Sequence, residues 1–577
     1  MRWMSYSKSG SNMTDIRRRR AGNRLLAILG VVVVAACARD PRLDVPTVTV
    51  PTAGLEAISA EGLAAAIGVL AHDSLEGRAP GTAGEDRTLR FLTNEFQQLG
   101  LVPGNGDSWT QDVPLVSITP NADMVMEISG DEQSETLAYK TDFVATTEQV
   151  VDAIALDDSE LVFVGYGIVA PEYGWNDYEG LNATGKTVVI LVNDPGYVTQ
   201  DPDLFTGRAM TYYGRWTYKY EEAARQGAAG ALIVHRTGPA GYPWAVVENG
   251  WSGPQFGLED AGDAPLLDVG GWITEERARE LFSRAGLDFD EMDRVALSPA
   301  FQPVPLGTLE VSVSISNSLA RSSSRNFLAV LPGAERPEEF VVYTAHYDHF
   351  GIDPTIEGDD KIYNGARDNA SGTAGLLEVA RGFMAAPEPP DRSIMFLAVT
   401  AEEQGLLGSK YYASHPVVPL DHTAAVVNMD GLITWGATHD ITVVGHGNSE
   451  LDDYAEWAAS MQDRVLVPDP HVEKGFFYRS DHFEFAKMGV PAFYTHPGND
   501  MVDGGVERGQ SEFDEYVAER YHKPSDEVDT TWDLAGAVQE LELYFMMGWR
   551  IANEDSWPNW REGNEFRGAR DAMMAPE

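Results

Sequence analysis

Three predicted strands in the second half of the chain are each followed by acidic or imidazole side chains. Apolar runs over 340–345, 394–400 and 424–429 have the length of buried strands. Helices are predicted over 370–384 and after Gly405, and a further strand is predicted over 326–331. Such alternation of strands and helices predicts an α/β fold, with a mostly parallel mixed sheet and helices on both faces.

The first half of the chain shows a different pattern of predicted elements. Helices are predicted over 59–71 and 84–99, and we expect them to pack on the main domain. From about 159 to 300 strands and turns dominate: strands are expected over 160–166, 187–192 and 229–235, and helices near 218–226 and after Thr274. This segment lacks a dense cluster of metal-ligating residues, so it is interpreted as an inserted β-rich domain of about 150 residues.

The charge balance limits the partners. The chain has 577 residues and a formal net charge of −47, although residues 1–36 carry seven Lys or Arg and one Asp. Without those residues the net charge is −53. An acidic surface repels phosphate backbones, so we predict no nucleic-acid partner.

A basic cluster and a short apolar run open the chain. Arg17 to Arg20 and Arg24 precede an apolar run over 25–36, which is typical of a signal peptide and too short to span a membrane. Residues 34–37, ending in the only cysteine, Cys37, resemble a bacterial lipoprotein signal. That resemblance implies export and lipidation at Cys37 as the only membrane contact, in the outer membrane or periplasm of a bacterial cell envelope. The alternative is a plain secretory signal and a secreted protein.

The side chains at the predicted strand ends have the types that two zinc ions and a free carboxylate require. His346 follows one strand, Glu402 and Glu403 the next, and Asp430 a third. Because sites in such sheets form beyond the carboxyl ends of the strands, we expect these side chains to converge on one edge. The complete predicted set is His346, Asp368, Glu402, Glu403, Asp430 and His522.

The adjacent residues Glu402 and Glu403 are the strongest indication of a metal site. Two carboxylates after a fully apolar strand need compensation, because uncompensated buried charge is costly. Adjacent side chains point in different directions, so one can bind a metal ion while the other faces bound water as a general base. The alternative interpretation is an exposed acidic turn. Asp348, two residues beyond His346, can accept the second ring N–H of that histidine and fix its tautomer.

Other candidates compete with this set. Asp368 could simply be an acidic residue favoured at a helix N-terminus. His349, His482 and His496 are near enough in sequence to compete as ligands, with His482 the strongest rival, and we assign all three to supporting or structural roles.

A nucleotide-binding motif is rejected. Residues 180–187 fit the phosphate-binding pattern G-x-x-x-x-G-K-[ST], but a predicted strand rather than a helix leaves the loop, so a β-turn explains them. The chain also lacks H-E-x-x-H and G-x-S-x-G, which argues against those hydrolase designs.

Taken in order, these segments resemble the co-catalytic di-zinc aminopeptidases related to bacterial leucyl aminopeptidase. The segments that carry the resemblance begin at His346-Tyr347-Asp348, Asp368-Asn369-Ala370, Glu402-Glu403-Gln404, Asn428-Met429-Asp430 and Tyr521-His522. Residues 227–232, after a helix, resemble a protease-associated domain, a module commonly inserted in this family. The implied division is a lipoprotein-type signal peptide (1–36), a linker (37–55), the first part of a catalytic domain (56–140), a protease-associated domain (141–305), the catalytic di-zinc peptidase domain (306–560) and a tail (561–577).

The resemblance implies the zinc exopeptidase fold and two Zn²⁺ per chain. It places His346 and Asp430 on one ion, Glu403 and His522 on the other, and Asp368 between them. Glu402 would be the general base, and Asp348 would orient His346.

The implied function is an exported zinc metallo-aminopeptidase that hydrolyses N-terminal residues from peptide substrates through a hydroxide shared by two zinc ions. The alternatives are a di-zinc carboxypeptidase or dipeptidase of the same fold, a single-zinc glutaminyl cyclase, and a non-catalytic binding protein like the transferrin-receptor ectodomains.

Three features are expected around this site. Arg367, directly before Asp368, is expected to place an additional cation near the substrate entrance. Residues 498–519, rich in Gly and acids, are interpreted as a loop without a match in the family. Tyr494 is a candidate for stabilising an oxyanion.

Overall fold

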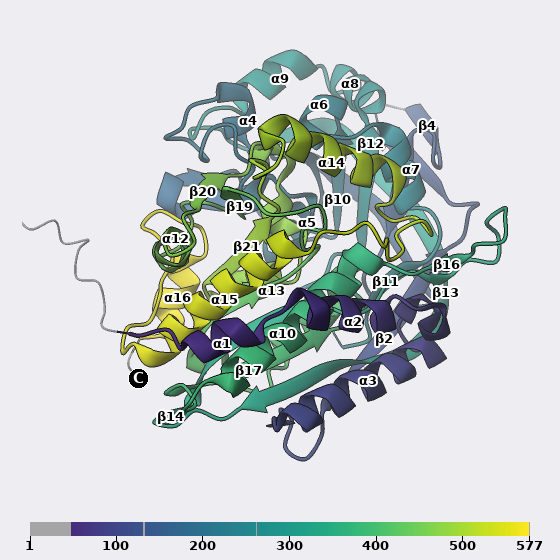
Figure 1. The fold of residues 1–577 in the computed structure, drawn as a ribbon. Helices are drawn as coiled ribbons and strands as arrows, with labels where there is room; N and C mark the ends of the chain where they lie inside the picture. The colour runs from purple at the N-terminus through teal and green to yellow at the C-terminus, as the bar shows by residue number, and fades with distance from the viewer. Residues whose placement is uncertain (1–47, 131–132, 261, 263, 576–577) are drawn as a thin grey trace, which may run out of the picture. The chain divides into compact units, whose positions relative to one another are not determined.

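The computed structural model describes residues 48–130, 133–260, 262 and 264–575 (Figure 1). The predicted signal peptide, Cys37 and most of the predicted linker lie outside the described residues. Within the described ranges, no helix is both long and apolar enough to cross a membrane.

The main sheet is parallel at its centre, where β17, β14, β18 and β21 run in one direction, while β13 is antiparallel to β17 and β19 is antiparallel to β21. The predicted α/β class with a mixed sheet is confirmed. The strand order is β11 (Gln255–Leu258), β2 (Thr110–Pro120), β13 (Val304–Leu331), β17 (Arg392–Val399), β14 (Arg336–His346), β18 (Thr423–Asn428), β21 (Ala492–His496), β19 (Asp440–Val444) and β20 (Val465–Pro468), and β1 (Val102–Pro103) also pairs with β13.

Helices cover both faces of this sheet. Side chains alternate along a strand, so Val341, Tyr343 and Ala345 of β14 join one apolar core while Val342 joins the other. The first core is closed by α1 (Thr52–Ala57), α2 (Ala60–Leu70), α3 (Ala83–Leu99), α10 (Gly372–Ala385), α12 (Leu451–Ser460) and α15 (Ala535–Asn553). The second includes residues of α11 (Leu407–Ser414) and α13 (His482–Lys487). Figure 1 shows α10 and α15 together on the near face of the sheet.

A second sheet shares the long strand β13 with the first. Its order is β4 (Gln133–Ala138), β3 (Val125–Gly130), β13, β6 (Ala153–Phe163), β9 (Thr187–Leu191), β10 (Gly230–His235), β12 (Val269–Thr274) and β5 (Phe143–Thr146). Its helices are α4 (Pro195–Thr199), α5 (Trp216–Arg225), α6 (Thr237–Ala240), α7 (Trp244–Gly250), α8 (Glu275–Arg284) and α9 (Phe289–Val295). The strands and helices expected in this region are present, while the domain limits of 141 and 305 stay predictions.

The segment that fits the phosphate-binding pattern ends in a strand, as expected. β9 begins at Thr187, and Lys186 pairs with Glu160 on the neighbouring strand β6. A strand leaving the loop does not present helix N–H groups to a phosphate.

The prediction of a loop over 498–519 is wrong, because α14 (Gly505–Glu519) occupies most of it. Gly509, Phe513 and Tyr516 recur at helical spacing and form its inner face. The glycines at the start of the segment and the acids on its outer face hide this short apolar stripe in the sequence.

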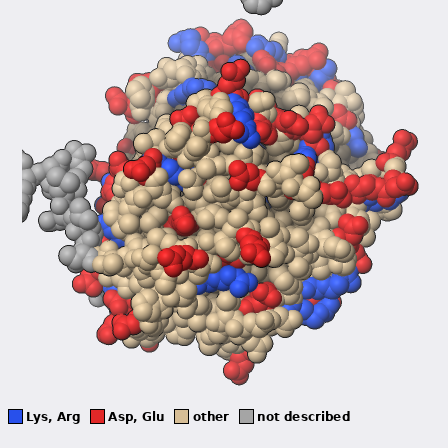
Figure 2. All heavy atoms as spheres, in the orientation of Figure 1, with Lys and Arg blue, Asp and Glu red and all other residues tan. Residues whose placement is uncertain are grey.

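Acidic side chains are scattered over the surface, with Lys and Arg among them (Figure 2). They form no single block on the face shown. The negative charge is therefore spread over the elements of that face.

Candidate metal centre

The predicted strand-end residues lie together at the carboxyl edge of the main sheet. His346 at the end of β14 pairs in register with Val399, the last residue of β17, and Thr344 pairs with Asn428 of β18. The strands therefore end at nearly the same level. Residues one to four positions beyond these ends are carried to one place, as the sequence predicted.

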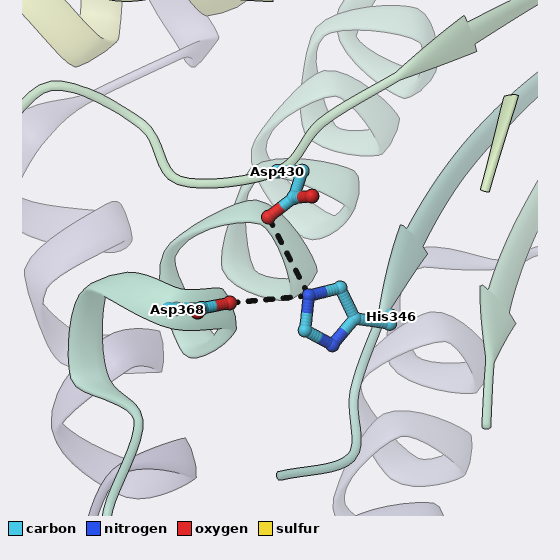
Figure 3. A group of neighbouring side chains, drawn as sticks. All are labelled: His346, Asp368 and Asp430. Carbon is cyan, nitrogen blue, oxygen red and sulfur yellow. Dashed lines mark ion pairs between the residues drawn. The ribbon is translucent and has the colours of Figure 1, made fainter. Parts of the chain in front are cut away.

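The imidazole of His346 faces two carboxylates (Figure 3). Its Nε2 lies 3.3 Å from Oδ1 of Asp368 and 3.5 Å from Oδ1 of Asp430. Glu402 Oε2 is 3.9 Å from the same nitrogen. This Nε2 is buried and has no hydrogen-bond partner of good geometry among the described residues. The three side chains leave a lone pair and two anionic oxygens directed at one point.

A second imidazole faces the other side of Asp368. Nε2 of His522 lies 3.2 Å from Oδ2 of Asp368 and 3.3 Å from Oε2 of Glu403. Two donors on one tetrahedral zinc, each about 2.1 Å from the ion, are about 3.4 Å apart. The distances in both groups match this spacing. The donor set therefore fits two zinc ions that share Asp368.

Asp368 is held by its backbone. The carboxylate of Asp526 accepts the N–H groups of Arg367, at 3.2 Å, and Asp368, at 3.0 Å. The side-chain amide of Asn369 donates to the backbone carbonyl oxygen of Met429 at 2.9 Å. A Cβ on Gly372 would lie 2.3 Å from that same carbonyl oxygen, so only glycine allows this approach. The loop carrying Asp368 is thus fixed to the end of β18.

Neighbouring polar groups orient Asp430. The hydroxyl of Ser480 donates to Oδ2 of Asp430 at 2.7 Å and accepts from Asn428 Nδ2 at 2.7 Å. These bonds leave Oδ1 of Asp430 directed at His346.

The surroundings of Asp348 differ from the expectation in one detail. Nδ1 of His346 is 3.2 Å from the backbone carbonyl oxygen of Asp348 and 3.8 Å from its carboxylate. The carboxylate instead accepts the backbone N–H of Glu402 at 3.1 Å. Asp348 therefore links His346 to the loop of the two glutamates, and its orienting role on His346 stays a prediction.

The histidine that competes for a metal ion is His349 rather than His482. Nδ1 of His349 is 2.5 Å from Oε1 of Glu403, and His349, Asp368 and Glu403 form a possible ligand group. Burial lowers the pKa of His349 to about 3, so the ring is neutral and can donate to Glu403. His482 lies 4.6 Å, centroid to centroid, from the ring of Phe477 and joins none of the possible ligand groups among the described residues.

The electrostatics of the cluster call for cations. Burial raises the pKa of Glu402 and of Glu403 well above the usual range, and neighbouring carboxylates add to the effect. Burial also opposes ionisation of Asp368, yet the nearby imidazoles of His346 and His522 hold its pKa well below the usual range. So many carboxylates in one buried place repel each other unless positive charge lies between them.

Arg78 supplies one fixed positive charge that sequence reasoning missed. It is 1% exposed and donates to the carbonyl oxygens of Leu70, Tyr347, Asn364 and Gly365 at 2.6 to 3.0 Å. Burial lowers its pKa to about 10, which leaves it charged at neutral pH. No local pattern around Arg78 indicates these partners.

The expectation that Arg367 lies at a substrate entrance is wrong. Its side chain is buried and donates to the carbonyl oxygens of Gly431, at 2.7 Å, and Leu432, at 3.1 Å. Its guanidinium lies 5.0 Å from the ring of Trp435 and 4.2 Å from that of Tyr516. Carbonyl oxygens and aromatic faces stabilise the cation away from solvent.

Tyr494 lies in β21 and is buried, with its ring 4.8 Å from that of His482. Its proposed part in stabilising an oxyanion stays a prediction.

Known proteins share the segment that carries the centre. Residues 326–546 match Peptidase family M28. Over 150 residues the chain is 35% identical to the aminopeptidase NAALADL1 of Mus musculus, covering 25% of this chain and 18% of that protein. Over 212 residues it is 36% identical to the aminopeptidase YwaD of Bacillus subtilis (strain 168), covering 36% of this chain and 40% of that protein. The chain thus matches less than two thirds of the length of these relatives.

A solved structure, an aminopeptidase from Aneurinibacillus sp. strain AM-1, is 19% identical and has a TM-score of 0.46, covering 88% of this chain and 97% of that chain. The segment matched by the family contains every residue of the predicted centre, from His346 to His522. Residues 326–546 of the chain are thus similar to peptidase family M28.

Proposed function

We propose that this protein is an exported zinc aminopeptidase that removes N-terminal residues from peptides. One observation carries the proposal: the two oxygens of Asp368 face different imidazoles, His346 at 3.3 Å and His522 at 3.2 Å. Zinc metalloproteases and aminopeptidases among the relatives support the choice of metal and reaction.

The residues divide the roles of a hydrolase between them. When bound, two zinc ions would make a shared water acidic and polarise the scissile carbonyl. His346 and Asp430 would hold one ion, Glu403 and His522 the other, and Asp368 both. Glu402 is not assigned to either ion, and its carboxylate lies 3.9 Å from Nε2 of His346. It is proposed as the base that takes a proton from water and returns it to the leaving amine.

The electrostatics at the carboxyl edge of the main sheet suit a substrate with a free N-terminus. The neighbouring carboxylates of Asp368, Glu402, Glu403 and Asp430 concentrate negative charge at the site. An ammonium group is attracted to that charge, and an acetylated N-terminus is not. This difference is the basis for proposing peptides with a free amino group as substrates.

Export and anchoring are part of the proposal, and so are the partners. They depend on the signal-like pattern before Cys37, which lies outside the described residues. Membrane contact would be limited to a lipid at Cys37, and nucleic acids are not expected to bind because of the net charge of −47.

The test combines metal analysis with peptide cleavage. Purified protein should contain about two zinc ions per chain, as a two-metal site requires, and lose activity when a chelator removes them. A peptide with a free N-terminus should lose its first residue, while the acetylated peptide should stay intact. Release of C-terminal residues would instead identify a carboxypeptidase, and protein without zinc and without cleavage would contradict both.

A further inference from the structure

Two arginines near the metal centre have no acidic partner. The Nε of Arg215 is buried and has no hydrogen-bond partner among the described residues. Arg479 makes one hydrogen bond, to the carbonyl oxygen of Lys474 at 2.7 Å. After burial, the largest electrostatic effects on the pKa of Arg215 come from Arg479 and three tyrosines. Within the described residues, both cations therefore lack a counter-ion.

Packing between the two sheets brings these arginines together. The segment before α5 contacts the segment before α13: Met210 N–H donates to the carbonyl oxygen of Val472 at 3.1 Å, and Arg208 pairs with Glu473 at 2.7 Å. Glu565 accepts from the Tyr212 N–H at 3.2 Å and from the hydroxyl of Tyr478 at 2.9 Å.

Arg215 lies one turn after Tyr212 and donates its backbone N–H to the carbonyl oxygen of Tyr212 at 3.0 Å. Arg479 directly follows Tyr478. Burial and then the like charge of Arg479 lower the pKa of Arg215 to about 10.

Two phenols accompany the pair. Tyr242, between α6 and α7, interacts electrostatically with both arginines. Tyr521 interacts with Arg479, and its ring stacks on His522 with the ring centroids 3.8 Å apart. Tyr521 is 43% exposed, so the group opens to solvent. The four side chains form a set of donors that continues from the metal centre toward the second sheet.

Two of these side chains are also tied to the metal centre through the backbone. Arg479 directly precedes Ser480, whose hydroxyl donates to Asp430 at 2.7 Å. Tyr521 directly precedes His522, which faces Asp368 and Glu403. A peptide that reached the metal centre would therefore pass close to Arg479 and Tyr521.

Leaving two adjacent cations unpaired is costly for this protein. Two like charges repel, and the Nε of Arg215 is buried without a hydrogen-bond partner, while the side chain of Arg479 is exposed and open to a ligand. The chain has 89 Asp and Glu against 42 Lys and Arg, so carboxylates are abundant and the arginines could readily have been paired. Their free donors suit a carboxylate, which arginine binds through two parallel hydrogen bonds.

We propose that Arg215 and Arg479, with the hydroxyls of Tyr242 and Tyr521, bind a carboxylate of the peptide substrate while its N-terminus lies at the metal centre. This proposal rests on the proposed function. The carboxylate has two sources: the C-terminus of a short peptide, or an acidic side chain next to the scissile bond. Either source makes the second sheet part of substrate selection.

The first experiment measures kcat and KM of the zinc-loaded full chain on two matched pairs. Ala-Ala-Ala and its C-terminal amide differ only in the terminal carboxylate, and Ala-Glu-amide and Ala-Gln-amide differ only in the side-chain carboxylate. A charge-assisted pair contributes about 1.5–3 kcal/mol, so one pair should show a preference of about 10- to 100-fold for the carboxylate, expressed mainly in KM. The pair that shows it identifies the source.

The variants Arg215→Gln and Arg479→Gln should each bring that preference close to one. Arg215→Lys keeps the charge but not the two-point geometry, so it should keep part of the preference. Arg294→Gln is the control, because Arg294 on α9 is exposed and pairs only with Glu291. It should preserve the preference of the parent. Zinc content and circular dichroism of each variant report whether it is folded.

A binding measurement separates this proposal from the proposed function. Calorimetry with zinc-loaded Glu402→Gln, a variant intended to bind without turnover, should show tighter binding of the carboxylate member of the preferred pair. That difference should vanish when Arg215→Gln is added. A parent protein that cleaves none of the four peptides contradicts the proposed function, yet the calorimetric difference would still support the arginine site. Equal binding of both members of both pairs, or a preference that survives both arginine variants, overturns it.

Discussion

Two carboxylates occupy equivalent places in the two sheets and meet different surroundings. Glu402 lies three residues beyond the end of β17, and Asp194 lies three residues beyond the end of β9. Asp194 accepts the N–H of Gly196 at 3.0 Å and both the N–H and hydroxyl of Thr211 at 3.1 and 2.8 Å. Among the described residues, no N–H or hydroxyl donates a hydrogen bond to the carboxylate of Glu402. Most of the charged groups that act on this carboxylate are other carboxylates. A carboxylate at a strand end thus indicates a site only when the protein leaves its oxygens without donors.

The second sheet also supplies its own cation. Lys219 is fully buried, donates to the carbonyl oxygen of Tyr166 at 2.6 Å, and interacts with Asp194 and Asp177. In the main sheet the corresponding positive charge has to come largely from metal ions. The four predictions that follow test this difference.

The largest effect is expected for Asp368→Ala. Without its two oxygens both proposed ions lose a ligand, so zinc content should fall from about two toward zero. Activity should fall on the order of 10⁴-fold or more, because metal ions carry much of an acceleration of at least about 10⁶. Metal analysis by mass spectrometry and peptide cleavage measure both.

Asp194→Asn is the matched control for that variant. It should lower stability and leave zinc content at the level of the parent. Zinc loss in Asp194→Asn, or full zinc in Asp368→Ala, would mean that the two strand ends do not differ as described.

Glu402→Gln should separate the base from the ligands. The amide keeps the size of the side chain but cannot take a proton, so kcat should fall by about 10²- to 10⁴-fold. Zinc content should stay near that of the parent, as metal analysis of the same sample can show. Cleavage at the parental rate would remove Glu402 from the proposed role.

Lys219→Met should act on stability alone. Removal of one partner from a buried ionic group costs about 3–5 kcal/mol, because Asp194 and Asp177 then stay buried without their cation. The midpoint of urea unfolding should fall, while zinc content and activity of the folded protein stay unchanged. Lys186→Met, at the more exposed pair with Glu160, should cost less than about 1 kcal/mol.

The smallest effect concerns an imidazole of the main sheet that no carboxylate faces. Burial lowers the pKa of His482 to about 3, so the folded state resists its protonation. As pH falls below about 6.5 the unfolded state takes up this proton, and stability is lost at about 1.4 kcal/mol per pH unit, or about 2 kcal/mol at pH 5.

Unfolding measurements between pH 7 and pH 5 should therefore show a shallower slope for His482→Phe than for the parent. The partly exposed His471, replaced by Gln, provides the comparison. An unchanged slope in His482→Phe would show that this ring does not control the pH dependence.

The features that local sequence determines were predicted well. His346, Glu402, Glu403 and Asp430 follow apolar runs whose length and alternation predict strands, and parallel strands bring their ends together. The supporting groups could not be found in this way. Arg78 donates to a carbonyl oxygen 269 residues away, and Asp526 accepts an N–H 159 residues away.

The errors have a common physical origin. Arg367 was expected to place a cation near the substrate entrance, whereas carbonyl oxygens and the rings of Trp435 and Tyr516 bury it. Tyr516 belongs to α14, the helix that was interpreted as a loop. The partners of Arg367 depend on tertiary packing, and no local pattern around Arg367 encodes them.

The bond between Asp526 and the loop of Asp368 has a consequence for the timing of synthesis. A ribosome that adds about 5–20 residues per second reaches Asp526 roughly 10 to 30 s after Arg367. Until then the N–H groups of Arg367 and Asp368 have no acceptor, and His522 has only just been added. A nascent chain therefore carries the carboxylates of the centre well before it can arrange them, so zinc binding in the native geometry is one of the last events in the making of this protein.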